Sequence, residues 1–417
     1  MGYIVEKQKQ KYLIKLPIEI DTDDEYLPTL RENFYQYGNW AKEFINSENG
    51  CMHLINSIEK QDMLKNVVNN SAMIINCVNA YYKGKVVLAS SITHNLLKRI
   101  IKADSNEFVS GPLDKNYSTR MISFYPSLID DSNKNLKSLK SMRESKLTFF
   151  RARTDYYSDY KEMYHIPLDR RDIVGTDRFS IPGIPCLYLG SSVYDTWLEL
   201  GRPAYHNFNV SAVKLTEEGK DLRVLNLAAN IYVILGLNEI LWDEKKKEER
   251  LAVVKTLLEL YPLVIATSIR NKRPAGKFRS DYIVSHLIML NLKKLGLDGV
   301  AYLSKRIEEG REDLAYPQFV NYAFPAFDTS AINKRYGKIC EKIRITKPRN
   351  YEEFLSTEIK ASERYEKNSY YLNAFPRGCE GDITNSIIIA GETIDYHDTW
   401  FCKFENCICG QKYNDLD

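Results

Sequence analysis

Apolar residues recur at steps of three and four positions through the first quarter of the chain. The clearest stretch runs from Glu25 to about Ser47, and its apolar members are Leu30, Phe34, Tyr37, Trp40, Ala41, Phe44 and Ile45. This spacing places them on one face of an amphipathic helix. Further helices are predicted around 54–82 and 91–103. The first 125 residues or so are therefore expected to be mostly helical, with the aromatic side chains in a core.

A polar segment separates this helical region from the rest of the chain. Residues 130–146, DDSNKNLKSLKSMRESK, are locally basic and contain few bulky apolar side chains. A nucleic-acid patch is one interpretation of such a run, and a solvated linker is the one that we favour. We therefore predict a first region over 1–146 that is mostly helical and ends in a basic linker.

The pattern changes between residues 147 and 330 to short apolar runs that alternate with helical stretches. The predicted strands are LTFFRAR, PCLYLG, NVSAVKL, LRVLNL, PLVIATSI and GVAYLS. The predicted helices are SSVYDTWLEL, KKKEERLAVVKTLLEL and DYIVSHLIMLNLKKL. Ser192 is placed to cap the first of them, with Asp195 as its capping-box partner. The sequence thus predicts an α+β domain with a mixed β core and flanking helices.

The last part of the chain, residues 331–417, is strongly charged. A basic run extends from Lys334 to Arg349, and a Glu-rich helix is expected near 351–366. Residues 381–405 have the pattern of a pair of strands. The pattern predicts these elements but no role for this C-terminal region.

Composition narrows the class of protein only in part. The chain has 417 residues, of which 44% are hydrophobic and 27% charged, and its formal net charge is only +3. Such a balance creates no strong field toward nucleic acid or membrane surfaces. No apolar run approaches the length of a membrane span, and the N-terminus lacks the pattern of a signal peptide. We therefore expect a cytoplasmic protein with no membrane partner and only weak or indirect contact with nucleic acid.

The cysteines and histidines give little support for a metal centre. The 8 cysteines are too few for a disulfide scaffold in so long a chain, so most are expected to be reduced thiols. A C-x4-C-x-C cluster leaves zinc open as an alternative, with Cys379, Cys402, Cys407 and Cys409 as its ligands. The 6 histidines are scattered without ligand spacing. No catalytic metal is predicted, and the common nucleotide-loop and hydrolase motifs are absent from the sequence.

Three arginines in apolar surroundings and one glutamate carry the most specific chemical signal. Arg151 and Arg153 lie in FFRARTDYY, and Arg178 opens RFSIPG. Glu199 lies among apolar residues in the helix that follows CLYLG. Guanidinium groups are poor core groups unless they are paired, and they bind phosphate oxygens bidentately. If these side chains converge, they suit an anionic ligand that carries a ribose, with Glu199 on the sugar hydroxyls and Tyr188 against a cationic or aromatic ring.

Five stretches in this part of the chain resemble the RES domain family, which is named for its arginine, glutamate and serine. They are FFRAR, HIPLDRRDIVGTDRFSIPGIPCLYLGSSVYDTWLELGRP, YPLVIATSI, FRSDYIVSHL and GLDGVAYLSKR, and they fall within about 147–325. Matched by motif, the family arginines fall on Arg151 and Arg178, the pocket tyrosine on Tyr188, the glutamate on Glu199 and the serine on Ser304. The resemblance implies a core like that of ADP-ribosyltransferases over 147–330.

The resemblance also implies an activity and partners. Members of the family are best known as toxins of bacterial toxin–antitoxin pairs that act on NAD+. We therefore expect cleavage of the nicotinamide–ribose bond by hydrolysis or phosphorolysis, with no cofactor beyond NAD+ as substrate. The expected catalytic residues are Glu199, Arg151 and Ser304, and the expected NAD+-binding residues are Arg178, Tyr188 and Arg153. Transfer of ADP-ribose to a protein and a non-catalytic module that binds nucleic acid or a partner protein are the alternatives, and an Xre-like antitoxin and a homo-oligomer are the expected assemblies.

Overall fold

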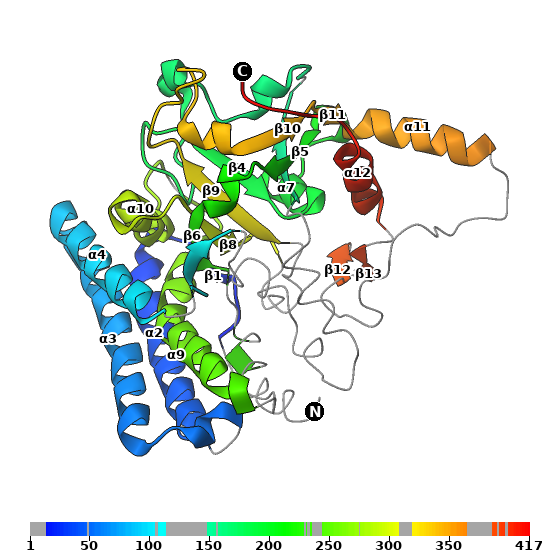
Figure 1. Cartoon of the computed structure of the whole chain (residues 1–417). Coiled ribbons are helices and arrows are strands. Elements are labelled where there is room, and N and C mark those ends of the chain that lie inside the picture. Colours follow the sequence, from blue (N-terminus) through cyan, green and yellow to red (C-terminus); the bar gives the residue numbers. More distant parts are fainter. Residues whose placement is uncertain are drawn as a thin grey trace.

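The computed structural model describes most of the chain (Figure 1). The described residues are 14–47, 50–104, 107–113, 148–155, 157–228, 231, 234–235, 244–274, 276–307, 319–364, 386–389, 392–396 and 399–417. The predicted basic linker at 130–146 and the candidate zinc ligand Cys379 lie outside these residues.

Three long helices form the N-terminal region and confirm its helical prediction. They are α2 (Tyr26–Ile45), α3 (Ser57–Tyr82) and α4 (Val86–Ala103), and they lie side by side with α9 (Glu244–Thr267) below the main sheet (Figure 1). The predicted apolar face is buried, and Leu30, Phe34 and Tyr37 belong to the core. The side chain of Asn56 caps α3 by accepting a hydrogen bond from the backbone N–H of Glu59 at 2.9 Å.

The prediction of a strand over PLVIATSI is wrong. Most of these residues form the last turns of α9, and only Ile269–Asn271 are extended, as strand β7. A continuous apolar run fits a buried helix and a buried strand equally well, because neither exposes a polar face. Here the run continues a predicted helix and packs among α2, α3, α4 and α10, where residues 256–269 are all buried. Pro262 lies inside this helix.

Ten strands form one mixed sheet in the described part of the chain. Its order is β14 (Tyr413–Asn414), β10 (Ile343–Thr346), β5 (Asn209–Leu215), β3 (Thr148–Arg153), β4 (Cys186–Gly190), β9 (Val320–Pro325), β8 (Gly299–Leu303), β6 (Arg223–Leu227) and β2 (Ser110–Pro112), and β11 (Arg349–Asn350) also pairs with β5. Neighbouring strands are antiparallel except β6 and β8. A mainly antiparallel sheet with helices on its flanks confirms the predicted α+β class.

All three regions predicted from the sequence contribute strands to this sheet. β2 comes from the N-terminal region and pairs with β6, whereas β10, β11 and β14 come from the C-terminal region and extend the opposite side from β5. A separate parallel pair joins β1 (Ile18–Ile20) to β7. Backbone hydrogen bonds therefore cross both predicted boundaries, and the division into 1–146, 147–330 and 331–417 stays a prediction.

Two helices from distant parts of the sequence pack together beside the sheet. α7 (Val193–Glu199) follows β4, and α12 (Trp400–Cys409) contacts it from the C-terminal region. The expected Glu-rich helix is α11 (Tyr351–Arg364), and α10 (Ile283–Asn291) joins the long helices. The predicted strand pair over 381–405 is right for β12 (Ser386–Ile389) and β13 (Glu392–Asp395) and wrong from Trp400 onward. Thr399 caps the helix that begins there.

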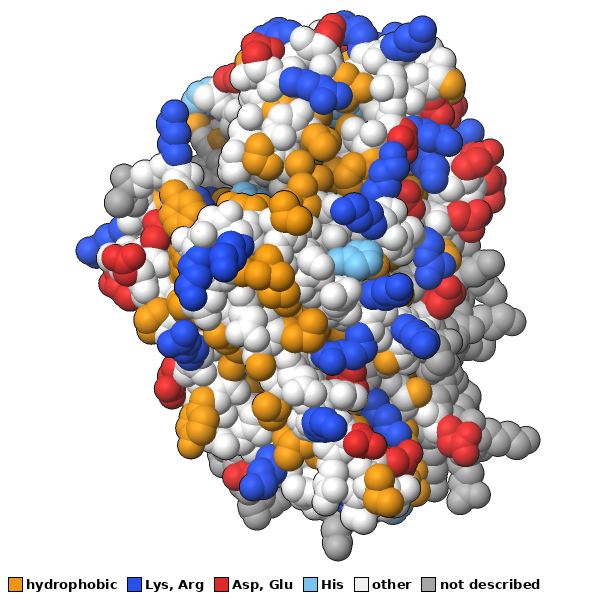
Figure 2. Space-filling view, turned by 90° about the vertical axis from the view of Figure 1, so that its left-hand side faces the viewer, with side chains coloured by type: hydrophobic (Ala, Val, Ile, Leu, Met, Phe, Trp, Pro, Cys, Tyr) orange, Lys and Arg blue, Asp and Glu red, His pale blue; other side chains and the backbone are white. Residues whose placement is uncertain are grey.

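Short 3-10 helices connect many of these elements. They are η1 (Asp23–Glu25), η2 (Gly50–Leu54), η5 (Tyr160–Met163), η6 (Leu168–Ile173), η7 (Tyr205–Asn207), η8 (Glu218–Asp221), η9 (Ser280–Tyr282), η10 (Lys293–Leu295) and η12 (Lys338–Lys342). Of the helices that the structure describes, none combines the length and apolar character needed to cross a bilayer. Figure 2 shows the face that carries α4 and α10, on which basic side chains are spread among apolar ones rather than gathered in one patch.

Candidate active site

A cavity of about 630 Å³ lies where β3, β4 and α7 meet the segments that precede β4 and follow β8. Five of the six residues predicted for the site line it: Arg151, Arg153, Arg178, Tyr188 and Glu199. The sixth, Ser304, is buried and hydrogen-bonded to the glutamate. The fold therefore gathers the whole predicted set, although these residues span more than 150 positions of sequence.

Glu199 is held by two uncharged donors. The hydroxyl of Ser304 donates a hydrogen bond to Glu199 Oε1 at 2.5 Å, and Nδ2 of Asn321 donates to the same oxygen at 3.2 Å. The antiparallel pairing of β8 and β9 brings these donors together, because Tyr302 lies opposite Asn321 in the register. No described cation forms an ion pair with Glu199, so its charge is available to a ligand.

Arg151 and Arg153 present their guanidinium groups on the same face of β3, since they are two residues apart in a strand. Arg151 donates to the backbone oxygen of Tyr188 at 3.2 Å, and Arg153 to that of Tyr164 at 2.7 Å. The Nε atoms of both arginines are buried without a hydrogen-bond partner. Burial, followed by the charge of Arg153, lowers the pKa of Arg151 to about 9, which still leaves it protonated at neutral pH. Two cationic groups thus share one side of the cavity.

Arg178 is held by carbonyl groups rather than by carboxylates. It donates to the backbone oxygen of Leu303 at 2.7 Å and to that of Thr267 at 3.4 Å. Its guanidinium lies 4.4 Å from the ring centroid of Tyr302 and 5.2 Å from that of Phe179. Neither interaction neutralises the charge of Arg178, and it forms no ion pair within the described residues. This leaves a fixed positive charge for an anionic ligand.

Tyr188 uses its hydroxyl within the protein. The hydroxyl donates to the backbone oxygen of Phe179 at 2.7 Å, which ties β4 to the segment that carries Arg178. Burial is the main reason why the pKa of Tyr188 is raised well above its usual value. The phenol therefore stays neutral, and the half-buried ring contributes a flat surface to the cavity.

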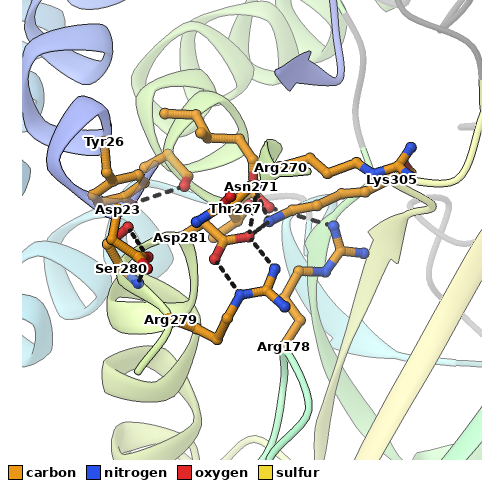
Figure 3. A network of polar contacts seen from close by, with 12 residues as sticks. Asp23, Tyr26, Arg178, Thr267, Arg270, Asn271, Arg279, Ser280, Asp281 and Lys305 are labelled. Carbon is orange, nitrogen blue, oxygen red and sulfur yellow. Dashed lines mark hydrogen bonds and ion pairs between the residues drawn. The ribbon is translucent and has the colours of Figure 1, made fainter. Parts of the chain in front are cut away.

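A salt-bridge network on the cavity wall was not expected from the sequence. Arg279 binds the carboxylate of Asp281 through Nε and a terminal nitrogen, both at 3.0 Å. Nζ of Lys305 lies 3.5 Å from the same carboxylate, and both cations converge on it in Figure 3. All three residues line the cavity, next to Arg178. In the sequence, the only sign was their position in the stretches FRSDY and SKR, which were noted for their resemblance alone.

The N-terminal region supports this network. Asp23 accepts hydrogen bonds from the backbone N–H and the hydroxyl of Ser280, at 2.7 and 2.6 Å (Figure 3). In the parallel pairing of β1 with β7, Glu19 lies beside Arg270, and it also forms an ion pair with Lys272 at 3.1 Å. Arg270 and Lys272 are cavity residues. The wall of the cavity is therefore built partly on residues before position 26.

Two further carboxyl groups accompany Glu199 and were not predicted as site residues. Asp177 lines the cavity, and its pKa is raised mainly by burial, although the nearby charge of Arg151 opposes the shift. Asp195 is fully buried one helical turn before Glu199. Its pKa is raised well above the usual range, first by burial and next by the charge of Glu199. In the sequence Asp195 was assigned only to a helix cap, so its place beside Glu199 was missed.

The cysteines near the C-terminus do not form a metal centre among the described residues. Cys402, Cys407 and Cys409 all lie on α12, and no group of three or more His, Cys, Asp or Glu side chains that could hold a metal ion occurs in the described ranges. A guanidinium nitrogen of Arg349 donates to the sulfur of Cys407 instead. These three donors do not fit a zinc site, and the fourth candidate, Cys379, lies outside the described residues.

The cavity thus combines Arg151, Arg153 and Arg178, which form no ion pair within the described residues, with the Glu199 carboxylate, which two uncharged side chains bind. The sequence is 33% identical over 183 residues to a protein of Bacillus subtilis (strain 168) named Putative toxin YopC. The match covers 42% of this chain and 40% of that protein, so the chain spans about two fifths of the length of this curated relative. No family model matches the sequence, and no solved structure matches it.

Proposed function

We propose that the chain is a toxin that cleaves the bond between nicotinamide and ribose in NAD+. One observation carries the proposal: a single cavity contains the Glu199 carboxylate, bound by Ser304, together with the guanidinium groups of Arg151 and Arg178, which have no described carboxylate partner. The resemblance to the RES family supports NAD+ as substrate. The name of the Bacillus subtilis relative supports the toxin assignment.

The charges of the cavity suit the diphosphate of NAD+. Arg151 and Arg178 would bind the phosphate oxygens, with Arg153 close enough on β3 to assist or replace either. Guanidinium groups bind phosphate through paired N–H donors, and partial burial strengthens such contacts. In this arrangement the ring of Tyr188 would lie against the nicotinamide.

Glu199 would supply the main electrostatic stabilisation of the reaction. As the bond between C1′ of the ribose and the nicotinamide nitrogen breaks, its electron pair leaves with nicotinamide, and positive charge develops on the ribose ring. A carboxylate that binds a ribose hydroxyl lowers the energy of this oxocarbenium-like state. Ser304 and Asn321 would orient that carboxylate. The acceptor oxygen then bonds to C1′ and gives up a proton.

The acceptor defines the reaction class. Water as acceptor yields ADP-ribose, inorganic phosphate yields ADP-ribose-1″-phosphate, and a protein side chain yields an ADP-ribosylated target. We favour loss of NAD+ to water or phosphate, because the cavity alone is sufficient for either reaction. An Xre-like antitoxin and self-association belong to the same proposal through the RES resemblance.

A non-catalytic module for nucleic acid has less support. The basic run at 334–349 would have to carry it, but two of its arginines are already paired with acids. Arg335 lies 3.1 Å from a carboxylate oxygen of Asp169, and Arg344 lies 2.7 Å from one of Asp415. Paired surface arginines release fewer counterions on binding a phosphate backbone and so contribute less affinity.

The proposal is tested with purified full-length protein, NAD+ and chromatographic detection of nicotinamide. Glu199→Gln should lower kcat by about 10²–10³, the size of effect expected when a charge-stabilising group is lost from an active site. Ser304→Ala should lower it by about tenfold, since one hydrogen bond to a charged group is removed.

Glu217→Gln is the matched control, because that carboxylate is 85% exposed and pairs only with Lys220. Its kcat should equal that of the wild type. Identification of the second product as ADP-ribose, its 1″-phosphate or a modified protein assigns the acceptor. Equal nicotinamide release by wild type and Glu199→Gln, or none by either, would remove the proposal.

A further inference from the structure

Asp195 is a buried carboxyl group that the proposed reaction does not use. It is 0% exposed, and neither of its side-chain oxygens has a hydrogen-bond partner in the described part of the chain. Gly190 lines the cavity, and a Cβ added to it would lie 3.5 Å from Asp195 Oδ2. The carboxyl therefore lies directly behind a wall residue that has no side chain.

The helix cap does not explain this carboxyl. The backbone N–H of Asp195 donates to Ser192 Oγ at 3.0 Å, which confirms the predicted cap. A capping box would also require the Asp195 carboxyl to accept from the backbone N–H of Ser192, and both carboxyl oxygens lack such a bond. The cap therefore gives no reason for a buried carboxyl at this position.

The surroundings of Asp195 are those of Glu199. The two residues are four positions apart and so lie on the same face of α7. Ser304 and Asn321, which donate to Glu199, also lie close enough to the Asp195 carboxyl to lower its pKa, although neither reaches it with full hydrogen-bond geometry. Two carboxyl groups that share one set of donors cannot both ionise easily.

Charges near α7 decide which of the two groups ionises. Burial and then the charge of Glu199 raise the pKa of Asp195, and Ser304, Arg178 and Asn321 oppose this shift only in part. The elements packed against α7 carry these titratable side chains: Arg151 and Arg153 on β3, Cys186 and Tyr188 on β4, and Cys402, Lys403, Glu405, Cys407 and Cys409 on α12. Glu405 accepts from the backbone N–H of Val193 at 2.6 Å, and burial raises its pKa to about 8. None of the cations on these elements bonds to the Asp195 carboxyl in the described part of the chain.

We propose that Asp195 is a positioning residue that stays protonated, so that the Asp195–Glu199 pair carries a single negative charge, which resides on Glu199. The inference rests on the proposed function for its effect on turnover, but not for the protonation itself. When Asp195 is neutral, the side chains of Ser304 and Asn321 remain free to donate their hydrogen bonds to Glu199. An ionised Asp195 would repel Glu199 and compete for both donors, so turnover should fall at alkaline pH.

The protonation is tested by thermal unfolding of the full chain without ligand from pH 5 to 8. In the unfolded chain Asp195 ionises near pH 4, about where free aspartate does, while the folded protein keeps the proton. The unfolded state therefore binds fewer protons over this range, and wild-type stability should fall with pH relative to Asp195→Asn, which cannot ionise. The melting temperature of Asp195→Asn minus that of wild type should rise steadily.

Asp172→Asn is the control, because that side chain is 68% exposed, and its difference from wild type should not grow with pH. If Asp195→Asn does not fold, Asp195→Ser replaces it in the comparison. The smaller serine leaves a cavity, but the stability lost to that cavity does not depend on pH. A difference that stays constant or shrinks as pH rises would overturn the inference.

The effect on turnover is tested by the pH profile of nicotinamide release. Wild-type kcat should fall by about tenfold per pH unit above the pKa of the pair, as for loss of one essential proton. Asp195→Asn should keep kcat within about threefold of wild type at neutral pH, because the substitution changes the geometry of only one hydrogen bond. The variant should also lack the fall in kcat at alkaline pH. The same alkaline fall in Asp195→Asn, or a loss at every pH like that of Glu199→Gln, would contradict the positioning role. Absence of release by wild type would reject the proposed function, and the unfolding comparison would still decide the protonation.

Discussion

Lys305 illustrates, at the scale of one residue, how burial changes the chemistry of a side chain next to the site. Its ammonium group donates to the backbone oxygen of Ile269 and lies 3.5 Å from Asp281. Burial lowers the pKa of Lys305 to about 7, with Arg178 and Arg279 acting in the same direction and Asp281 against it. The wall of the cavity therefore loses a positive charge close to neutral pH.

This charge should affect the binding of an anionic substrate. Below pH 7 the protonated Lys305 favours binding of NAD+, and above pH 7 the lysine is neutral, so KM for NAD+ should rise severalfold between pH 6 and 8.5. Lys305→Met should show a high KM that does not change over this range. Lys220→Met, at a partly exposed position outside the cavity, should behave as the wild type does. A wild-type KM that is independent of pH would refute this role of Lys305. The pH effect of Lys305 on KM can be told apart from that of Asp195, which acts on kcat.

The sequence identified some of these residues and not others for physical reasons. Arg151, Arg178 and Glu199 stood out because charged groups are unusual among apolar neighbours. Asp281 and Lys305 did not, because their contact joins positions 24 residues apart that only the folded chain brings together. Asp195 was assigned to a helix cap because its spacing from Ser192 fits one. Its burial beside Glu199 could not be predicted, because that burial depends on the sheet behind α7.

At the scale of the element, α7 decides the geometry of the site. It has only 7 residues, yet it carries both Asp195 and Glu199. Because so short a helix has little stability of its own, its position depends on its ends and its packing. Ser192 caps its first turn, Glu405 of α12 accepts from Val193, and the indole N–H of Trp197 donates to the backbone oxygen of Pro203 at 2.9 Å.

Loss of the cap should therefore reduce activity as well as stability. Ser192→Ala should lower the free energy of unfolding by about 1 kcal/mol, the usual cost of losing a serine cap, and should lower kcat for nicotinamide release. Asn56→Ala removes the cap of α3 and should cost a similar amount without affecting kcat. Chemical denaturation and steady-state kinetics on both variants separate the two effects. Equal kcat in both would show that α7 does not depend on its cap.

Elements with a clear polar face were predicted well, whereas the fully buried run PLVIATSI was assigned to the wrong class. The stripe that includes Leu30 and Phe34 predicted α2 because its opposite face is polar. PLVIATSI has no polar face, so the spacing of its apolar residues could not distinguish a helix from a strand. The start of α12 was missed because the aromatic residues Trp400, Phe401 and Phe404 are as common in strands, whereas here they pack as a helix against Tyr351 and Phe354.

At the scale of the whole molecule, the N-terminal region is part of the architecture around the cavity. β2 extends the main sheet, β1 pairs with β7, and Asp23 binds Ser280 beside the Arg279–Asp281 pair. The β1–β7 pairing and the contact between Asp23 and Ser280 connect residues more than 200 positions apart. The N-terminal region therefore contacts the cationic wall through the hydrogen bonds between Asp23 and Ser280.

Asp23 offers a direct test of this connection. Asp23→Ala removes two hydrogen bonds to Ser280 and should lower the free energy of unfolding by about 1–3 kcal/mol while raising KM for NAD+ severalfold. Asp24→Ala changes the adjacent, exposed aspartate and should leave KM unchanged. If both variants have wild-type KM values, the N-terminal region does not support the site.

The most direct test of the central claim is the time course of free nicotinamide released from NAD+ by the full-length protein. The wild type should release one nicotinamide for each NAD+ consumed, and Glu199→Gln, although folded, should release it about 10²–10³ times more slowly. Wild-type protein that leaves NAD+ intact, or a Glu199→Gln variant as fast as the wild type, would contradict the claim that this cavity cleaves NAD+ through Glu199.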